Sequence, residues 1–361
     1  MPQLFGPNQQ IHFCASRDGT RIAYATMGEG PPLVKAANWL THLELDWGSP
    51  VWRHWLAELA RHHTLVRYDE RGCGLSDREA ADISFEAFVQ DLEAVVDALR
   101  LERFVLLGIS QGGAIAVAYA VRHPERVSHL VLYGAYPRGR NARARSPGER
   151  EEAETMVKLV ELGWGREDPA FRQFFTAQFI PGGTLEQQRW FNELERRSAS
   201  PEAAVRILRA FHEIDVTALA PQITRPTLVL HSDGDARVPF DEGRLFASLI
   251  PGARFVPLAS RNHILLEPEP AWRDFVAELR GFLPRTAGAR TEGFGDLGAR
   301  ESEVLELIAQ GLDNAQIAAR LGLSEKTVRN HITAIFTKVQ AETRAQAIVH
   351  ARDAGYGKAS A

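Results

Sequence analysis

The chain has 361 residues, a formal net charge of −4, 45% hydrophobic residues and 24% charged residues. This length exceeds one ordinary domain and predicts a domain of about 250–300 residues together with a small second one. The charge excludes a general polycation, so any surface that binds nucleic acid must be local.

Two features of the chain predict its compartment. The two cysteines, Cys14 and Cys73, lack the spacing of a zinc site or of a disulfide framework. Such cysteine usage is typical of a protein in the reducing cytoplasm. The N-terminal segment lacks the basic and apolar regions of a signal peptide, and no apolar run reaches about 18 residues. We therefore expect a cytoplasmic protein with no cofactor, no metal site and no membrane partner.

Up to about Leu283, short apolar runs alternate with helix-length amphipathic segments. The runs are 21–28, 31–38, 63–72, 104–110, 127–136 and 226–235. Near-continuous apolar strands between helices indicate an α/β fold with a mostly parallel sheet that is covered on both faces. Segment 84–101 places Phe88, Leu92 and Val95 at helical spacing just before the run at 104–110, which predicts a strand–helix–strand crossover.

This regularity breaks between about 137 and 215, in a charged insertion of helical character that is rich in aromatic residues. One interpretation makes these aromatic residues the core of a small helical subdomain. Another makes some of them the roof of a ligand pocket, because long insertions in compact α/β domains are commonly functional. The two interpretations are compatible, and we predict a cap in which Phe175 and Phe179 line the pocket.

Residues 285–298 are rich in glycine, arginine and threonine, lack periodicity and are predicted to form a linker. A domain of residues 1–284 would precede this linker, and a small all-α domain of residues 299–361 would follow it. Capping signals favour helices in the second domain, because Asp313 or Asn314 precedes one apolar helical segment and Ser324 precedes another.

Ser110 stands in the sequence GISQG, between the apolar run at 104–110 and a helical segment at 112–124. A nucleophile elbow requires this strand–turn–helix context, because glycines relieve the crowding of the tight turn and let the helix approach the sheet. The backbone N–H of Gln111 would then face an oxyanion. The sequence therefore predicts that Ser110 is a nucleophile rather than an ordinary turn serine.

A nucleophilic serine needs a base and an orienting acid, expected in the chain order Ser, Asp, His. Asp235 follows an apolar strand, and His263 follows the apolar segment 253–258. Both would lie at the carboxyl ends of strands, which is the edge where sites assemble in open α/β sheets. Asp233 remains the alternative to Asp235 for the acid.

Residues from about Phe13 to Leu283 resemble the α/β-hydrolase superfamily. The features that carry the resemblance are YDERGCGLSD at 68–77, GISQG at 108–112, D-x-x-V-P at 235–239 and Asn-His at 262–263, in this order. The resemblance implies Ser110 as nucleophile, His263 as base, Asp235 as orienting acid and the insertion as a cap over the site.

The loop after the third strand departs from the pattern of the superfamily. Many members have His-Gly there, whereas this chain has Ala37-Asn38, so that Trp39 would supply the second oxyanion N–H. Asn38 tolerates a positive φ nearly as well as glycine does, which would preserve the turn. We predict that Asn38, Trp39 and Trp47 line a pocket for a bulky apolar ligand.

The C-terminal segment places apolar residues three and four positions apart, so that they would share one small core. These residues are Leu305, Ile308, Ile317, Leu321, Val328, Ile332, Ile335 and Val339. A helical docking or oligomerisation bundle is one interpretation. The segment also resembles the LuxR-type helix-turn-helix, through RESEVLELIAQGLDNAQIAARLGLSEKTVRNH at 300–331. That resemblance implies a recognition helix at 324–337 that lies in the major groove of DNA.

Local charge supports DNA binding, because residues 320–344 include five basic and two acidic side chains in a chain of net charge −4. The outward residues predicted to contact base edges are Arg329, Asn330 and Thr333. The residues predicted to contact phosphates are Lys326, Thr327 and Lys338. An ordinary solvated residue is the alternative interpretation of Arg329.

Together these segments predict a DNA-binding transcriptional regulator that acts as a homodimer on double-stranded DNA. Its α/β-hydrolase-like domain would bind a small apolar ester-, lactone- or lipid-like ligand, and the three triad residue types are compatible with hydrolysis of that ligand. The alternative is a serine esterase or lactonase with an accessory DNA-binding domain. A dehalogenase is disfavoured because it would carry aspartate in place of Ser110. A phosphorylation-switched response regulator is disfavoured by the Ser–Asp–His order.

Overall fold

The computed structural model describes residues 9–164, 169–283, 297–339, 341, 343–354 and 356–357. The chain divides into two compact units, Met1–Leu283 and Pro284–Ala361. The predicted linker at 285–298 lies outside the described residues except for its last two positions, so its limits stay a prediction. None of the described helices is long and apolar enough to cross a membrane.

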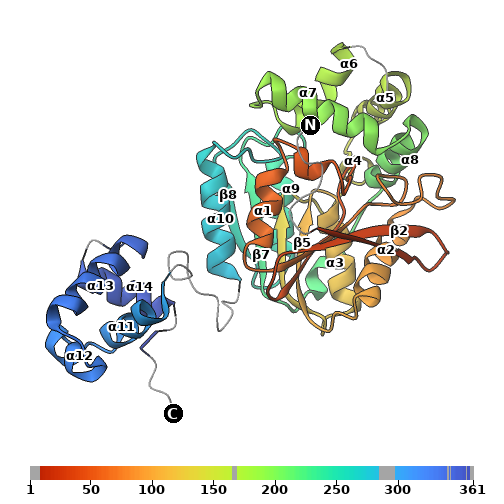
Figure 1. Cartoon of the computed structure of the whole chain (residues 1–361). Helices are drawn as coiled ribbons and strands as arrows, with labels where there is room; N and C mark the ends of the chain where they lie inside the picture. The colour runs from red at the N-terminus through yellow and green to blue at the C-terminus, as the bar shows by residue number, and fades with distance from the viewer. Residues whose placement is uncertain are drawn as a thin grey trace. The chain divides into compact units, whose positions relative to one another are not determined.

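The first unit is built on an eight-stranded sheet in the order β1-β2-β4-β3-β5-β6-β7-β8 (Figure 1). The strands are β1 (Gln10–Ala15), β2 (Arg21–Met27), β3 (Pro32–Lys35), β4 (Thr64–Tyr68), β5 (Phe104–Ile109), β6 (Val127–Tyr133), β7 (Thr227–Ser232) and β8 (Arg254–Leu258). β1 pairs with β2 and β2 with β4 in antiparallel fashion, and all other pairs are parallel. The predicted α/β fold with a mostly parallel sheet is confirmed.

Helices cover the sheet because its central strands are apolar on both faces: all six residues of β5 are buried. The helices that pack against strands are α1 (Arg53–Ala60), α2 (Phe85–Ala98), α3 (Gly112–Arg122), α9 (Phe240–Leu249) and α10 (Pro270–Phe282). The hydroxyl of Ser84 caps α2 by accepting a hydrogen bond from the N–H of Ala87. The crossover predicted at 84–101 is therefore present, although its helix ends at Ala98, just before Arg100 with its φ of 50°.

The insertion between β6 and β7 consists of five helices in the described residues, which we call the cap. They are α4 (Arg140–Arg143), α5 (Pro147–Gly163), α6 (Pro169–Phe179), α7 (Leu185–Ser198) and α8 (Pro201–His212). Trp164, Phe175, Phe179, Phe191 and Phe211 are buried in the cluster that also contains the sheet residues. The cap aromatics therefore pack as core. The cap helices lie over one end of the sheet (Figure 1).

The second unit consists of α11 (Ala299–Ala309), α12 (Asn314–Leu321), α13 (Glu325–Lys338) and α14 (Arg344–Asp353). Asp313, rather than Asn314, caps α12, and its carboxylate accepts a hydrogen bond from the N–H of Gln316. Gly322, at φ 66°, ends α12, and Ser324 then caps α13. The apolar residues predicted at three- and four-residue spacing do share one core.

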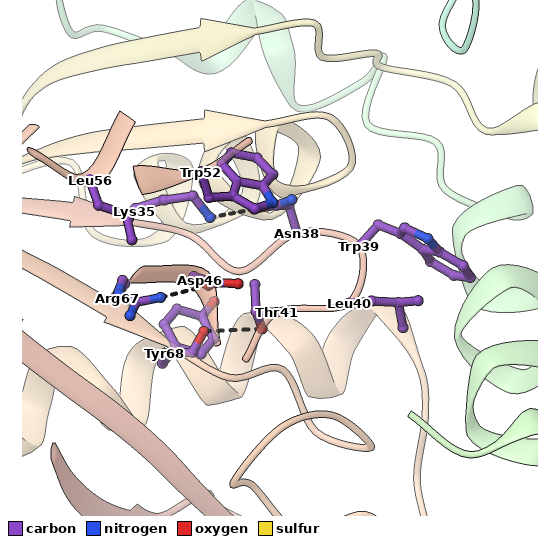
Figure 2. Close-up of a pocket in the computed structure, with 10 residues that line it drawn as sticks. All are labelled: Lys35, Asn38, Trp39, Leu40, Thr41, Asp46, Trp52, Leu56, Arg67 and Tyr68. Carbon is purple, nitrogen blue, oxygen red and sulfur yellow. Dashed lines mark hydrogen bonds and ion pairs between the residues drawn. The ribbon is translucent and has the colours of Figure 1, made fainter. Parts of the chain in front are cut away.

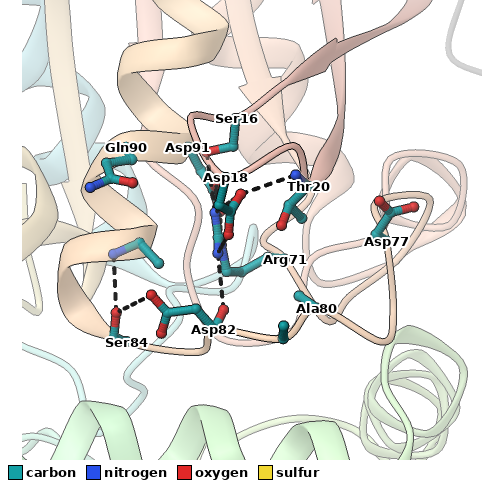
Figure 3. Close-up of polar contacts among 12 residues, drawn as sticks. Ser16, Asp18, Thr20, Arg71, Asp77, Ala80, Asp82, Ser84, Gln90 and Asp91 are labelled. Carbon is teal, nitrogen blue, oxygen red and sulfur yellow. Dashed lines mark hydrogen bonds and ion pairs between the residues drawn. The ribbon is translucent and has the colours of Figure 1, made fainter.

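Arg71 of the YDERGCGLSD motif has no exposed side-chain surface and holds the N-terminal strands to α2 (Figure 3). Its Nε and Nη2 atoms bind both oxygens of Asp91, at 2.8 and 2.6 Å, and its Nη1 binds Asp18 at 2.7 Å. The side chain of Asp91 is fully buried, whereas that of Asp18 is 36% exposed. The motif therefore contributes a structural ion pair.

The variant Asp91→Asn is expected to lower the free energy of unfolding of the first unit by about 3 kcal/mol, because the buried guanidinium of Arg71 loses its buried carboxylate partner and keeps only the partly exposed Asp18. Asp18→Asn, at the half-exposed end of the same network, should cost less than about 1 kcal/mol. Urea unfolding followed by tryptophan fluorescence measures this, because all seven tryptophans lie in the first unit. Equal losses of unfolding free energy for the two variants would contradict the expectation that the buried Asp91 contributes more than the partly exposed Asp18.

Candidate functional site

Ser110 lies in the tight turn between β5 and α3, and its φ is 55°. A residue other than glycine in this left-handed region is strained, which is typical of a nucleophile elbow. The flanking glycines are required because any side chain there would clash with neighbouring backbone. A Cβ at Gly108 would lie 2.5 Å from the Cα of Gly113, and one at Gly112 would lie 2.7 Å from the carbonyl oxygen of Ala37. The GISQG sequence therefore forms the predicted turn and brings it against the loop that follows β3.

Asp235 follows β7, and His263 lies in the loop after β8. Nδ1 of His263 is 2.7 Å from Oδ2 of Asp235. Oδ1 of Asp235 accepts hydrogen bonds from the N–H groups of Arg237 and Val238, at 2.8 and 2.9 Å. Burial alone would raise the pKa of Asp235, but the His263 imidazole and these N–H groups hold it below its usual value. Asp235 is therefore ionised and able to orient the imidazole.

The segment Tyr133–Gly134 brings the serine and the histidine to the same edge of the sheet. The N–H of Ser110 binds the carbonyl oxygen of Tyr133 at 3.0 Å. A Cβ added to the next residue, Gly134, would lie 3.0 Å from Cε1 of His263. The other ring nitrogen of His263, Nε2, is buried and has no hydrogen-bond partner among the described residues. This nitrogen is thus left for a hydroxyl group or a substrate.

Asp233, the alternative acid, occupies a different position. It is exposed, and its Oδ1 accepts a hydrogen bond from the N–H of Ser260 at 3.3 Å. Only Asp235 of the two contacts the histidine. The sequence left this choice open because both carboxylates follow the same strand within three positions.

The loop after β3 carries the candidate oxyanion donors. Ala36 continues the sheet through a 2.9 Å bond from its N–H to the carbonyl oxygen of Leu107. Within the described residues, neither the N–H of Trp39 nor that of Gln111 donates a hydrogen bond. An oxyanion site requires backbone N–H groups without another acceptor, so these two N–H groups stay candidates for it.

The expected positive φ at Asn38 is wrong, because the left-handed residue of this loop is Leu40, with a φ of 51°. The side chain of Asn38 instead accepts a hydrogen bond from the buried ammonium group of Lys35. Burial lowers the pKa of Lys35 to about 8. Figure 2 shows Lys35 and Asn38 at a small cavity beneath the loop, whereas Trp39 is directed away from it toward the cap.

The predicted pocket residues separate into two groups. Trp39 packs edge-on against Trp164 of the cap, which packs in the same way against Phe175. Phe179 lies 5.8 Å from the His263 ring, between centroids, and its carbonyl oxygen binds the N–H of His263. By contrast, the indole of Trp47 binds Gln9 near the N-terminus. Trp39 and Phe175 thus belong to one aromatic cluster with Trp164, Phe179 lies against His263, and the described contact of the Trp47 indole is with Gln9.

Sequence reasoning missed several polar residues under the cap. Glu195 accepts a 3.2 Å hydrogen bond from Nε1 of Trp39, and burial raises its pKa to about 8. Arg237 stacks 5.2 Å from the centroid of Phe179. His212 is buried, and its Nε2 has no partner among the described residues. Of these residues, only Arg237 carried a signal, because it lies inside the D-x-x-V-P motif.

In the second unit, Val328, Ile332 and Ile335 of α13 are buried, as predicted. The exposed residues of the helix include Lys326, Arg329, Asn330 and Thr333. The hydroxyl of Thr327 is 2.8 Å from that of Ser324 at the helix start. Lys338 is paired with Glu301 at 2.7 Å, so its charge is partly neutralised within the protein. The exposed face of α13 is thus polar and basic, with Lys326 and Arg329 on it.

Comparison with known proteins agrees with both units. The sequence profile described as "alpha/beta hydrolase fold" matches residues 43–270, which is more than half of the chain. The chain belongs to the alpha/beta hydrolase fold family. The profile "Bacterial regulatory proteins, luxR family" matches residues 296–351, so this family member also carries a C-terminal luxR-type domain, which implies DNA binding.

Relatives of the hydrolase-fold domain are enzymes. A pyrrolizixenacetamide deacetylase from Xenorhabdus hominickii is 26% identical over 270 residues, which cover 73% of this chain and 94% of that protein. A 2-hydroxymuconate semialdehyde hydrolase from a Pseudomonas species is 31% identical over 239 residues, covering 60% of this chain and 76% of that protein. The crystal structure of an esterase from a Rhodococcus species matches with a TM-score of 0.59 and 26% identity, over 75% of this chain and 98% of that one.

Proposed function

We propose that the protein is a transcriptional regulator whose alpha/beta hydrolase domain binds, and hydrolyses, a small ester- or lactone-class ligand that controls DNA binding. The observation that carries the proposal is the His263–Asp235 pair, whose Nε2 has no partner among the described residues, at the sheet edge that also carries Ser110, in a chain that also has a luxR-type domain. The esterase and hydrolase relatives support the chemistry.

In the proposed reaction, Ser110 attacks the ester carbonyl carbon while Nε2 of His263 takes its proton. The N–H groups of Gln111 and Trp39 stabilise the oxyanion. His263 then protonates the leaving alcohol, and the acyl group remains on Ser110. Water, deprotonated by His263, attacks this acyl-enzyme, releases the acid and restores the serine. Asp235 keeps the imidazole in the required orientation throughout.

DNA recognition is assigned to α13, with Arg329, Asn330 and Thr333 toward base edges and Lys326 toward a phosphate. Thr327 and Lys338 stay candidates for phosphate contacts. Two-fold symmetry of a homodimer would place half-sites about one helical turn of DNA apart. Ligand bound in the hydrolase-fold domain would change how the two luxR-type domains of the homodimer contact these DNA half-sites.

The test measures fluorescence anisotropy of the labelled duplex that precedes the protein's own reading frame, against a random duplex, between about 50 and 200 mM salt. We expect a preference of at least about 10³ for the promoter duplex and a steep salt dependence of both affinities. Equal affinity for the two duplexes would exclude the regulator.

Ligand control is tested by labelling Ser110 covalently with a small alkylphosphonofluoridate, which reacts with activated serines. The labelled protein should differ from unlabelled protein in promoter affinity, with Ser110→Ala exposed to the same reagent as the matched control. An unchanged affinity after complete labelling would contradict control by ligand. If the protein hydrolysed esters but showed no preference for the promoter duplex, the result would favour the alternative, an esterase with an accessory DNA-binding domain.

A further inference from the structure

Three arginines gather around Tyr136 under the cap. Arg140 and Arg143 come from α4, and Arg237 comes from the loop after β7. All three are half-buried. The charges of Arg140 and Arg143 both act on Arg237, and all three guanidinium groups act on the hydroxyl of Tyr136. Residues far apart in the sequence thus bring three positive charges to one place.

None of the three guanidinium groups forms an ion pair with a carboxylate of the described residues. Arg237 donates to Oε1 of Gln178 at 2.8 Å, and Arg143 donates to the carbonyl oxygen of Arg138 at 3.3 Å. Arg140 has no side-chain hydrogen bond to any residue that the structure describes. Burial, followed by the charge of Arg140, lowers the pKa of Arg237 to about 10, so it stays protonated at neutral pH.

The described carboxyl groups near this cluster form no ion pair with its guanidinium groups. Burial raises the pKa of Glu195 to about 8, so Glu195 is largely neutral at pH 7, and burial also raises the pKa of Glu70 well above its usual value. Glu242 is already paired with Arg138 at 2.5 Å. Glu149 and Glu152, which face Arg143 and Arg140 from α5, are exposed. Half-buried guanidinium groups without a close carboxylate favour an anionic partner for the cluster.

The cluster adjoins the candidate catalytic residues. Phe179 is in contact with both, because its ring lies 5.2 Å from the Arg237 guanidinium and 5.8 Å from the His263 imidazole, measured to ring centroids. Arg237 is two positions after Asp235, and Tyr136 is two positions after Gly134, the residue against His263. A ligand held by the arginines would therefore extend toward Ser110.

Neutral hydrogen-bonding groups complete the surroundings. The hydroxyl of Tyr136 forms no hydrogen bond to a described residue. Nε2 of His212 is buried without a partner in the described part of the chain, and burial lowers the pKa of His212 to about 3. The imidazole is thus neutral, and in the tautomer protonated at Nε2 it carries a free hydrogen-bond donor. Both groups are able to donate to a carboxylate oxygen.

We propose that the ligand is an ester or lactone that also bears a carboxylate, which Arg140, Arg143 and Arg237 bind while Ser110 attacks the ester carbonyl. The ester group in this inference rests on the proposed function, and the carboxylate rests on the arginine cluster. It amends the expectation of an apolar ligand: the middle of the ligand would lie against the aromatic residues of the cap, and one end of the ligand would be charged.

The first test compares two activated esters of equal acyl length, 4-nitrophenyl hydrogen glutarate and 4-nitrophenyl pentanoate. After subtraction of spontaneous hydrolysis, we expect kcat/KM of the wild type to favour the glutarate by at least about tenfold, as charge-assisted hydrogen bonds require. Arg237→Gln and Arg140→Gln should each reduce this ratio severalfold. Arg209→Gln is the matched control, because Arg209 lies on α8, is half exposed and pairs with Glu154. Its ratio should equal that of the wild type.

The second test separates binding from hydrolysis. Calorimetry on Ser110→Ala measures the Kd of monomethyl glutarate and of neutral dimethyl glutarate. Tighter binding of the monoanion, lost in Ser110→Ala with Arg237→Gln, supports the anion site even if no ester is turned over. Equal binding of both esters, or an unchanged ratio in the arginine variants, overturns the anion site and leaves the proposed hydrolysis standing.

Discussion

Ser110→Ala is expected to reduce hydrolysis of 4-nitrophenyl esters by at least about 10⁴-fold, because it removes the nucleophile on which the His263–Asp235 pair acts. The residual rate would come from the oxyanion donors and from binding alone. Steady-state kinetics at neutral pH measures this loss, with active-site labelling used to count functional sites. Ser248→Ala is the matched control, since Ser248 is exposed on α9 and its hydroxyl binds only Leu245 among the described residues.

The same variant should keep its fold and its promoter affinity in the absence of ligand. The hydroxyl group of Ser110 forms no hydrogen bond to a described residue, so its removal breaks no structural hydrogen bond among them. Turnover that survives in Ser110→Ala would mean that another residue is the nucleophile. Loss of promoter affinity together with turnover would mean that the side chain acts structurally, and it would contradict the separation of catalysis from DNA binding.

The parts of the fold that sequence predicts well are those set by local patterns. The runs that became β4, β5, β6 and β7 are apolar and lie between helices, so burial on both faces determines them. β1 gave no such signal, because it is an edge strand whose residues are mostly exposed or half-buried. The second unit was readable almost throughout, since Asp313, Gly322 and Ser324 mark its helix ends locally.

The candidate site was predictable where one residue type is required at one position. A serine between glycines suits the elbow, and the aspartate and histidine then follow at strand ends. The choice between Asp233 and Asp235 depends on which carboxylate meets the imidazole, which is a tertiary contact. The orientation of Asn38 likewise depends on the buried Lys35, which no local pattern connects to it.

The arginine cluster lay beyond sequence reasoning for a related reason. Arg140 and Arg143 belong to a four-residue helix in a charged insertion, where arginine is ordinarily a surface residue. Their significance arises only because α4 begins against α8: a Cβ at Gly139 would lie 2.2 Å from the carbonyl oxygen of Phe211. Close approach of two cap helices thus turns ordinary charged residues into a candidate binding site.

The double variant Arg329→Ala with Asn330→Ala is expected to weaken promoter binding by at least about 100-fold while changing affinity for random duplex much less. Each side chain is exposed on α13 beside the buried Val328, and bidentate contacts to guanine or adenine contribute about 1–3 kcal/mol of discrimination each. Lys326→Ala should act differently. It should weaken binding to both duplexes alike and lower the slope of log Kd against log salt by about one, as loss of one phosphate contact requires. Anisotropy titrations at several salt concentrations distinguish the two patterns, with circular dichroism confirming that α13 remains folded.

If Arg329 were only a solvated residue, the double variant would keep the wild-type preference for the promoter. If Lys326 read bases, its replacement would instead change the ratio of promoter to random affinity and leave the salt slope unchanged. The contrast therefore assigns base contact and phosphate contact to separate positions of one helix.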